Sequence, residues 1–317
     1  MAKRTPAEAR KIFKEMVAKL EVPVVAAPMF IVSGPRLVRA ECDAGIIGSF
    51  PALNARPAEA LTEWLDEIKQ SERPFAVNHI VHRSNDRLMH DLEVTVKHQV
   101  PLAITSLGAR PEVFEATQSY GGLCFHDVIN NTFAKKAIEK GADGLILVAT
   151  GAGGHAGTLS PFAFVAEVRE WFDGPILLSG AIGSGAGVLA AQAAGADAAY
   201  IGSAFIATDE ANAPDPYKEG VAMGDMEDIV YTNYFSGIHG NYMKSSIKAA
   251  GMDPDNLPEA DPSKMDFKSG GENSAKVWKD IWGAGQGIGS VKSVGSTASL
   301  VDRLSKEYAT AKDGLLS

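Results

Sequence analysis

Short runs of apolar, often β-branched residues recur through the first two thirds of the chain, and segments with helical periodicity separate them. Residues 58–70, for example, place Leu61, Trp64, Leu65 and Ile68 on one helical face. The apolar runs are continuous rather than alternating, which is typical of parallel strands covered on both faces. Their alternation with helices predicts βαβ units around a parallel sheet. We expect eight strands, at residues 22–27, 46–50, 75–80, 102–107, 123–128, 144–149, 175–179 and 198–206.

Glycines mark the ends of several predicted helices. Gly141 and Gly195 are each followed by Ala-Asp and then an apolar run, a pattern typical of a left-handed helix end leading into a strand. Eight strands at this spacing predict a closed (β/α)8 TIM barrel, with an open doubly wound sheet as the alternative. We expect a barrel core at residues 1–210, a mostly helical cap at 211–285, and a C-terminal segment at 286–317 whose helix returns to the barrel.

Composition and charge narrow the class of protein. The 317 residues are 45% hydrophobic and 22% charged, as in ordinary globular proteins. With 30 Lys+Arg against 39 Asp+Glu, the net charge of −9 excludes a chain-wide basic footprint for nucleic acid. Two cysteines indicate a reducing compartment and argue against a Cys-rich metal site. No apolar run reaches membrane-spanning length, and the basic N-terminus lacks the features of a targeting peptide. We expect a cytoplasmic enzyme without a nucleic-acid or membrane partner and without a metal.

The loop expected after the sixth strand is the most unusual segment. Four glycines surround His155 within residues 150–157. Active sites of such barrels lie at the C-terminal ends of the strands. Glycine allows the backbone to approach a planar ligand closely, and a histidine there can take a proton from a substrate. The alternative is a flexible turn whose histidine only hydrogen-bonds the scaffold.

A second glycine-rich segment, residues 179–185, leads directly into an Ala-rich helix, and Gly202-Ser203 ends the eighth run. Backbone N–H groups at a helix N-terminus bind anions, and barrels often bind phosphate after strands 7 and 8. These glycines do not complete a dinucleotide-binding fingerprint. The alternative is a βα turn that holds no ligand.

Together these motifs resemble the nitronate monooxygenase family, also called the 2-nitropropane dioxygenases. The matching segments are residues 24–29 (Val-Val-Ala-Ala-Pro-Met), Asn78, residues 153–157 (Gly-Gly-His-Ala-Gly), residues 179–182 (Ser-Gly-Ala-Ile), Gly202-Ser203 and residues 283–287 (Gly-Ala-Gly-Gln-Gly). Their order and spacing cover nearly the whole chain. The resemblance implies a barrel that binds flavin mononucleotide (FMN).

The resemblance also implies roles for individual residues. His155 aligns with the active-site histidine of the family. The implied cofactor contacts are Ala27, Pro28 and Met29 against the flavin ring, Asn78 as its hydrogen-bond partner, Gly153 and Gly154 at the ring edge, Ser179, Gly180, Ala181, Gly202 and Ser203 around the phosphate, and Gly285 and Gln286 on the far side. Gly151 stands where many relatives carry a glutamate, which leaves the substrate open.

The implied reaction is oxidation of an alkyl nitronate by O2 to a carbonyl compound and nitrite. A nitroalkane would first lose a proton to His155, which would act as a base or an electrostatic catalyst. Related flavin-dependent NAD(P)H:quinone and enoyl-thioester reductases share much of the pattern, so such a reductase is the alternative. A phosphate-binding barrel without flavin and a flavin-binding module without turnover are further alternatives.

Three other histidines are candidates for substrate contact. His79 and His126 lie in or directly after predicted strands, and His239 lies among aromatic residues of the expected cap. For His79 and the nearby His82, no carboxylate or third histidine lies at metal-binding spacing. A homodimer and the use of NAD(P)H are both compatible with the sequence.

Overall fold

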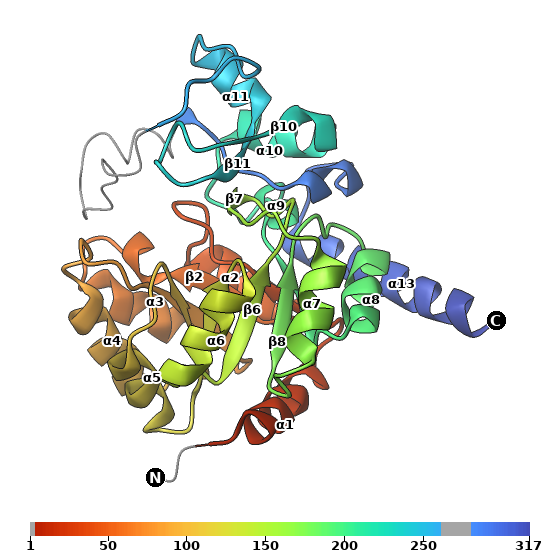
Figure 1. The fold of residues 1–317 in the computed structure, drawn as a ribbon. Helices are drawn as coiled ribbons and strands as arrows, with labels where there is room; N and C mark the ends of the chain where they lie inside the picture. The colour runs from red at the N-terminus through yellow and green to blue at the C-terminus, as the bar shows by residue number, and fades with distance from the viewer. Residues whose placement is uncertain (1–3, 261–279) are drawn as a thin grey trace.

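The computed structural model describes residues 4–260 and 280–317 and shows a barrel with a smaller lobe above its upper end (Figure 1). Eight parallel strands follow the order β1-β9-β8-β6-β5-β4-β3-β2. The first and last strands of this order meet through a parallel bridge between Val25 and Ile47. There, the Ala26 N–H donates to the Ile47 carbonyl at 2.8 Å. The sheet therefore closes on itself, which confirms the predicted (β/α)8 barrel and rules out the open sheet.

The element bounds follow the predicted rhythm. The barrel strands are β1 (Val24–Ala26), β2 (Gly48–Pro51), β3 (Phe75–Ile80), β4 (Leu102–Ser106), β5 (Leu123–Val128), β6 (Gly144–Val148), β8 (Ile176–Ser179) and β9 (Ala198–Ile201). The helices of the barrel are α1 (Pro6–Val17), α2 (Pro35–Asp43), η1 (Ala52–Asn54), α3 (Ala60–Lys69), α4 (Leu88–Lys97), α5 (Pro111–Gln118), α6 (Asn131–Lys140), α7 (Pro161–Arg169), α8 (Gly185–Ala194), α9 (Ser203–Ile206) and α13 (Thr297–Leu316). The run expected at 198–206 is thus a strand only to Ile201.

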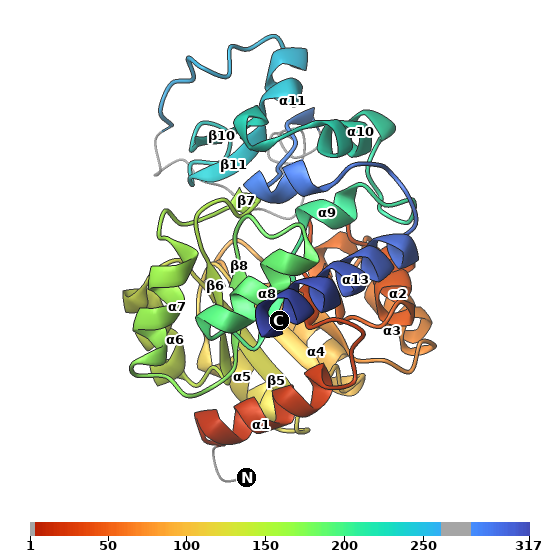
Figure 2. The same ribbon diagram turned by 90° about the vertical axis from the view of Figure 1, so that its right-hand side faces the viewer.

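Helix α1 covers the N-terminal end of the barrel (Figure 2). Thr5 begins it with a capping box to Glu8, which satisfies backbone N–H groups that the first turn leaves open. Its Phe13 is fully buried against the strand side chains of the barrel interior and contacts Phe125 edge-on at 5.0 Å between ring centroids. One end of the barrel is therefore filled with apolar side chains, and the C-terminal end of the strands is left for chemistry.

The C-terminal helix α13 returns to the barrel and lies along α8 and α2 (Figure 2). Its apolar face buries Leu300, Val301 and Leu304. The Glu307 carboxylate accepts a hydrogen bond at 2.8 Å from the backbone N–H of Gly185, which is the first residue of α8. A carboxylate at a helix N-terminus is electrostatically favourable, so this contact helps to hold α13 in place.

The upper lobe was expected to be mostly helical, but it also contains strands. It holds α10 (Asp215–Met223), η2 (Met226–Asp228), β10 (Ile229–Thr232), β11 (Gly240–Met243), α11 (Lys244–Ala249) and the turn η4 (Gln286–Ser290). Strands β10 and β11 form an antiparallel sheet with β7 (Gly154–His155), which belongs to the loop after β6. This loop supplies the backbone partners that the lobe needs for a sheet. Residues 261–279 of the expected cap lie outside the described residues.

Within the described ranges, no helix combines the length and apolar character needed to cross a membrane.

Candidate active site

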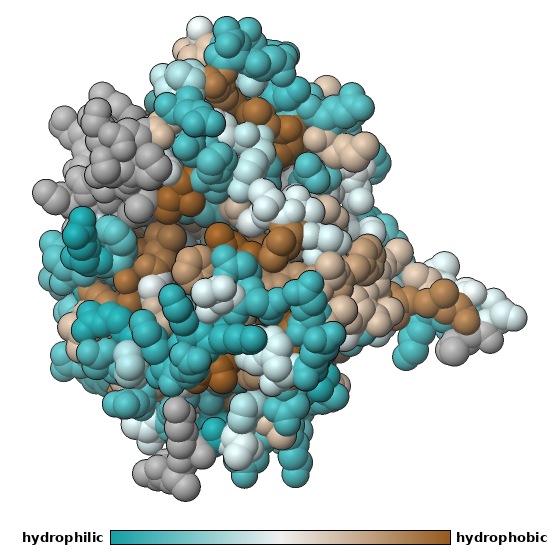
Figure 3. All heavy atoms as spheres, in the orientation of Figure 1, coloured by the Kyte–Doolittle hydropathy of each residue, from teal (hydrophilic) through white to brown (hydrophobic). Residues whose placement is uncertain are grey.

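A cavity of about 1550 Å³ opens at the C-terminal ends of the barrel strands, beneath the upper lobe. Apolar side chains gather along the band between barrel and lobe in the space-filling view (Figure 3). Inward-facing residues of successive strands form the floor, one layer above the apolar interior. They are Asn78 of β3, Ser106 of β4, Asp127 of β5, Val148 of β6, Ser179 of β8 and Tyr200 of β9. Each follows by two positions a residue of the interior, as the two-residue period of strands requires.

Four polar residues of this floor are close together. Asn78 Nδ2 donates to Ser106 Oγ at 2.7 Å, and Ser106 Oγ donates to Asp127 Oδ2 at 2.5 Å. The remaining Asp127 oxygen, Oδ1, and the hydroxyl of Tyr200 are buried without a hydrogen-bond partner among the described residues. Burial raises the pKa of Asp127 to about 7, and the hydrogen bond from Ser106 opposes this rise. Unpartnered buried polar atoms are rare in native proteins, so these two indicate a ligand at the floor.

The glycine-rich loop forms one wall, where the backbones of two distant segments approach closely. A Cβ atom added at Gly153 would lie 2.8 Å from the Gly285 nitrogen and 3.0 Å from the Ala284 carbonyl carbon, so only glycine fits. The Gly285 N–H donates to Ser203 Oγ at 2.8 Å, and Asn241 Nδ2 donates to the Ala152 carbonyl at 2.6 Å. Residues from α9, β11 and the 283–287 segment thus hold this wall in place.

His155 lies in this wall, half-buried in β7 and paired with Gly240 of β11. Its Nε2 is 2.9 Å from Ser236 Oγ. The Ser236 hydroxyl donates to the Ile238 carbonyl at 3.0 Å, so its lone pairs can accept from the imidazole. This arrangement favours the tautomer with the proton on Nε2 and the basic lone pair on Nδ1. Burial lowers the pKa of His155 to about 4, so the protein keeps the ring neutral near pH 7.

The structure brings most of the predicted site residues to the cavity. Those that line it are Ala27, Pro28, Met29, Asn78, Gly153, Gly154, His155, Ser179, Gly202 and Ser203. Gly180, Ala181, Gly285 and Gln286 lie behind this lining. The N–H groups of Ala181 and Gln286 both donate to the Gly151 carbonyl, at 3.3 and 2.8 Å. These two residues support the loop through Gly151, and their N–H groups are already engaged.

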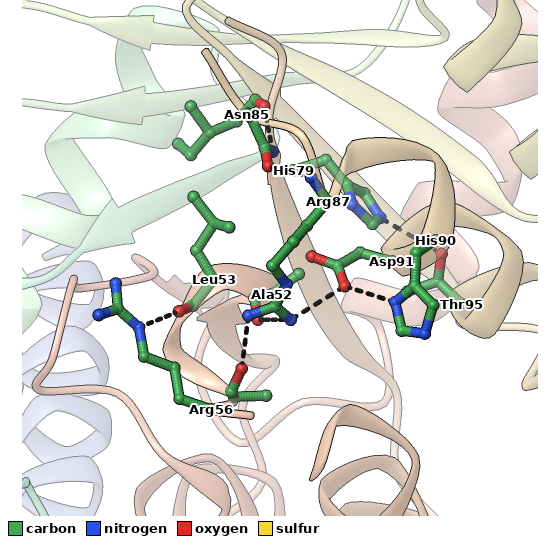
Figure 4. Close-up of polar contacts among 11 residues, drawn as sticks. Ala52, Leu53, Arg56, His79, Asn85, Arg87, His90, Asp91 and Thr95 are labelled. Atoms are coloured by element: carbon green, nitrogen blue, oxygen red, sulfur yellow. Dashed lines mark hydrogen bonds and ion pairs between the residues drawn. The ribbon is translucent and has the colours of Figure 1, made fainter. Parts of the chain in front are cut away.

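The predicted substrate contact of His79 is corrected by the structure (Figure 4). Asn78 faces the cavity, so the next residue of the strand faces the opposite side, toward α4. There His79 is fully buried, its Nε2 is 3.3 Å from Thr95 Oγ1, and burial lowers its pKa to about 4. Beside it, Arg87 contacts Asp91 at 3.0 Å and the Ala55 carbonyl at 2.7 Å. This buried network ties α4 to the segment after β2.

The other two candidate histidines also make structural contacts. His126 lies at the margin of the cavity, with Nδ1 2.6 Å from Thr105 Oγ1, and burial lowers its pKa to about 4. The His239 ring stacks on Tyr231 at 5.1 Å between centroids, and it is not part of the cavity lining. A direct substrate contact by the His239 side chain is therefore not supported. Among the residues described, no group of three His, Cys, Asp or Glu side chains is arranged to hold a metal ion.

Several residues of the site were not predicted. Ser106, Asp127 and Tyr200 carried a usable signal, because each lies two positions beyond an inward-facing apolar residue of its strand. Ser236 and Asn241 lie in residues 234–242, where aromatic residues and a histidine among glycines suit either a substrate wall or a packed loop. Their contacts with the His155 loop depend on strand pairing with a segment about 80 residues away.

The backbone conformation and surroundings of Gly151 allow a specific test. Gly151 has a φ of 79°, and a Cβ atom added there would lie 3.1 Å from the Ala181 Cβ, so both features disfavour a side chain. We expect Gly151→Glu to lower the free energy of unfolding by about 2–4 kcal/mol through strain and crowding. Chemical denaturation measures this loss. The control is Gly121→Glu, because Gly121 has φ 93° and open space, so only the strain of about 1–2 kcal/mol should appear. Equal losses for both variants would contradict crowding at Gly151.

Comparison of the sequence with known proteins identifies similar proteins and a matching family. The family model described as "Nitronate monooxygenase" matches residues 50–307. A nitronate monooxygenase of Paraburkholderia phytofirmans is 25% identical, covering 91% of this chain and 92% of the relative. A protein of Rhodococcus jostii is also 25% identical, and the match covers 75% of this chain and 67% of the length of the relative. It is named (3aS,4S,5R,7aS)-5-hydroxy-7a-methyl-1-oxo-octahydro-1H-indene-4-carboxyl-CoA dehydrogenase.

A solved structure extends this likeness to the fold. The nitroalkane oxidase of Streptomyces ansochromogenes superimposes with a TM-score of 0.79 at 26% identity, covering 94% of this chain and 99% of the oxidase. The region matched by the family model includes β3 to β9, the His155 loop and the 283–287 segment, which supply most of the cavity lining. This chain therefore belongs to the nitronate monooxygenase family of oxidoreductases.

Proposed function

We propose that this protein is an FMN-dependent oxidoreductase that oxidises alkyl nitronates with O2 to a carbonyl compound and nitrite. The observation that carries the proposal is His155, held neutral in the wall of a cavity whose floor presents polar atoms that find no partner in the described part of the chain. Family membership supplies the reaction class, and the nitroalkane oxidase likeness supports a nitro compound as substrate.

The residues present fit a flavin. The cavity volume exceeds what a small nitronate needs by several times, so it has room for a cofactor beside the substrate. The backbone of Ala27 to Met29 lines one side, and Asn78 offers an amide at the floor. Asp127 Oδ1 and the Tyr200 hydroxyl, which have no partner within residues 4–260 and 280–317, supply further partners for a polar ring. When bound, FMN supplies the electron transfer that no amino-acid side chain provides.

The chain's own residues then bind, orient and move a proton. Glycines 153 and 154 let the main chain approach a flat ligand, while the apolar band excludes water above it. Ser236 fixes the imidazole of His155, whose unprotonated nitrogen can take the α-proton of a nitroalkane. For a substrate that already is a nitronate, the same ring orients the anion without proton transfer.

The test is an aerobic assay with FMN-reconstituted protein and propane-2-nitronate. We expect O2 uptake with release of nitrite, and no uptake from FMN alone. Protein that binds FMN yet forms no nitrite from nitronates of several chain lengths would overturn the proposed substrate class.

A second candidate is an FMN-dependent NAD(P)H:quinone or enoyl-thioester reductase. The size of the cavity favours it, because the space and the apolar side chains of Ile129, Phe133 and Ile238 can receive a longer acyl group. The Rhodococcus jostii relative named as a carboxyl-CoA dehydrogenase agrees with such a ligand. Steady-state oxidation of NADPH that depends on crotonyl-CoA or menadione would support this second function.

A further inference from the structure

The floor of the cavity contains an acid that the proposed reaction does not use. Asp127, the last residue but one of β5, lies directly above the fully buried Phe125, in the inward-facing layer described above. Only its Oδ2 is hydrogen-bonded, through Ser106 to Asn78, while Oδ1 has no partner within the described part of the chain. The hydroxyl of Tyr200, across the barrel on β9, has no partner there either.

Because two polar groups on one cavity floor have no partner among the described residues, a ligand with polar atoms at its lower surface can satisfy both. We propose that Asp127 and Tyr200 hydrogen-bond the ring system of bound FMN, and that the protonation state of the Asp127 carboxyl sets the preference of the protein for reduced over oxidised cofactor. This inference rests on the proposed FMN binding. It assigns to this chain a positioning residue that also senses pH.

Among the described groups that face the cavity floor, Asp127 is the one whose charge changes near neutral pH. Tyr200 faces it from β9, and burial together with the Asp127 charge raises the pKa of that phenol, which therefore stays protonated. Ser106 and Asn78 on the neighbouring strands and Val148 and Ser179 on β6 and β8 carry no charge. His155, in the wall above, is neutral, and Lys136 lies at the cavity margin on α6.

The direction of the effect follows from charge. A neutral carboxyl can donate to the ring, whereas an ionised one places a negative charge beside a cofactor that must accept electrons. With the pKa of Asp127 at about 7, the wild-type protein favours reduced FMN less and less as pH rises through neutrality. An asparagine at this position has nearly the same shape and cannot ionise.

The experiment compares wild type with Asp127→Asn from pH 5.5 to 8.5. Flavin fluorescence gives the Kd of oxidised FMN, and dye equilibration gives the midpoint potential of the bound cofactor. We compare the ratio of the Kd of oxidised FMN to the Kd of reduced FMN in the two proteins. At pH 5.5 we expect this ratio to be the same in wild type and Asp127→Asn within about twofold. At pH 8.5 we expect it to be about tenfold lower in the wild type than in the variant. Asp302→Asn, an exposed acid on α13, is the control and should follow the wild type.

Ser106→Ala tests the same point without removing the carboxyl. Loss of its hydrogen bond raises the pKa of Asp127 further, so the pH dependence should move to higher pH. Identical profiles for wild type, Asp127→Asn and Ser106→Ala would overturn the inference while leaving FMN binding intact. A wild-type protein that binds no FMN at any pH would instead overturn the proposed function.

Discussion

Replacing His155 with glutamine is expected to lower kcat for a neutral nitroalkane by about 10²–10⁴-fold, the usual contribution of a positioned general base. The imidazole is neutral near pH 7 because burial lowers its pKa to about 4, and Ser236 holds its Nε2 at 2.9 Å. Glutamine fills similar space and can hydrogen-bond Ser236, but it cannot accept a proton. Initial rates of nitrite release from 2-nitropropane measure the loss.

Two comparisons separate proton transfer from mere loss of structure. A preformed nitronate needs no deprotonation, so its kcat should fall far less in His155→Gln than that of the nitroalkane. His239→Gln, whose ring stacks on Tyr231 outside the cavity lining, should keep wild-type rates. A His155→Gln enzyme with equal losses on both substrates, or with none, would contradict the role of His155 as base.

Acid is expected to destabilise the fold in a pH range set by buried histidines. His79 is fully buried, and its pKa is lowered from 6.5 to about 4 by desolvation. Between these values the unfolded chain takes up a proton that the folded protein does not, so stability is full above pH 6.5 and falls as the pH decreases toward 4. The shift corresponds to roughly 3 kcal/mol for His79 alone. His126, with a similar shift, adds to the loss.

Urea denaturation at pH 7.5 and at pH 4.5 measures this effect in His79→Gln. We expect the variant to be less stable than wild type at pH 7.5, with a gap that narrows by about 2–3 kcal/mol at pH 4.5. Thr95→Val removes the same side-chain contact but keeps the titrating ring, so it should retain the wild-type pH dependence. A His79→Gln variant with the wild-type pH dependence would show that folding does not shift the pKa of His79.

Residues close together in sequence were the most predictable part of the molecule. Continuous apolar runs identified all eight barrel strands, and Gly141 and Gly195 adopt the left-handed helix ends that their sequence context predicted. Sequence motifs also led to His155 and Asn78 at the cavity. These features depend on local conformation and on the two-residue period of strands, which a sequence shows directly.

The predictions that failed concern the face of a strand on which a side chain lies and the pairing of strands that are far apart in the sequence. His79 follows Asn78 on the same strand, yet alternation sends it to the opposite face, so proximity to a strand end was a misleading guide. Strands β10 and β11 were missed because each has four residues and because β7, which completes their sheet, lies more than 70 positions earlier. The contact between His155 and Ser236 depends on that pairing and has no local signal.

The most direct test of the account is anaerobic spectroscopy of the FMN-reconstituted protein. We predict a bound-flavin absorbance band near that of free FMN that is bleached by propane-2-nitronate and persists on addition of NADH or NADPH alone. Rapid bleaching by NADH or NADPH without bleaching by nitronate would contradict nitronate oxidation and favour the reductase. Failure of the protein to take up FMN at all would contradict the assignment of the cavity as a flavin site.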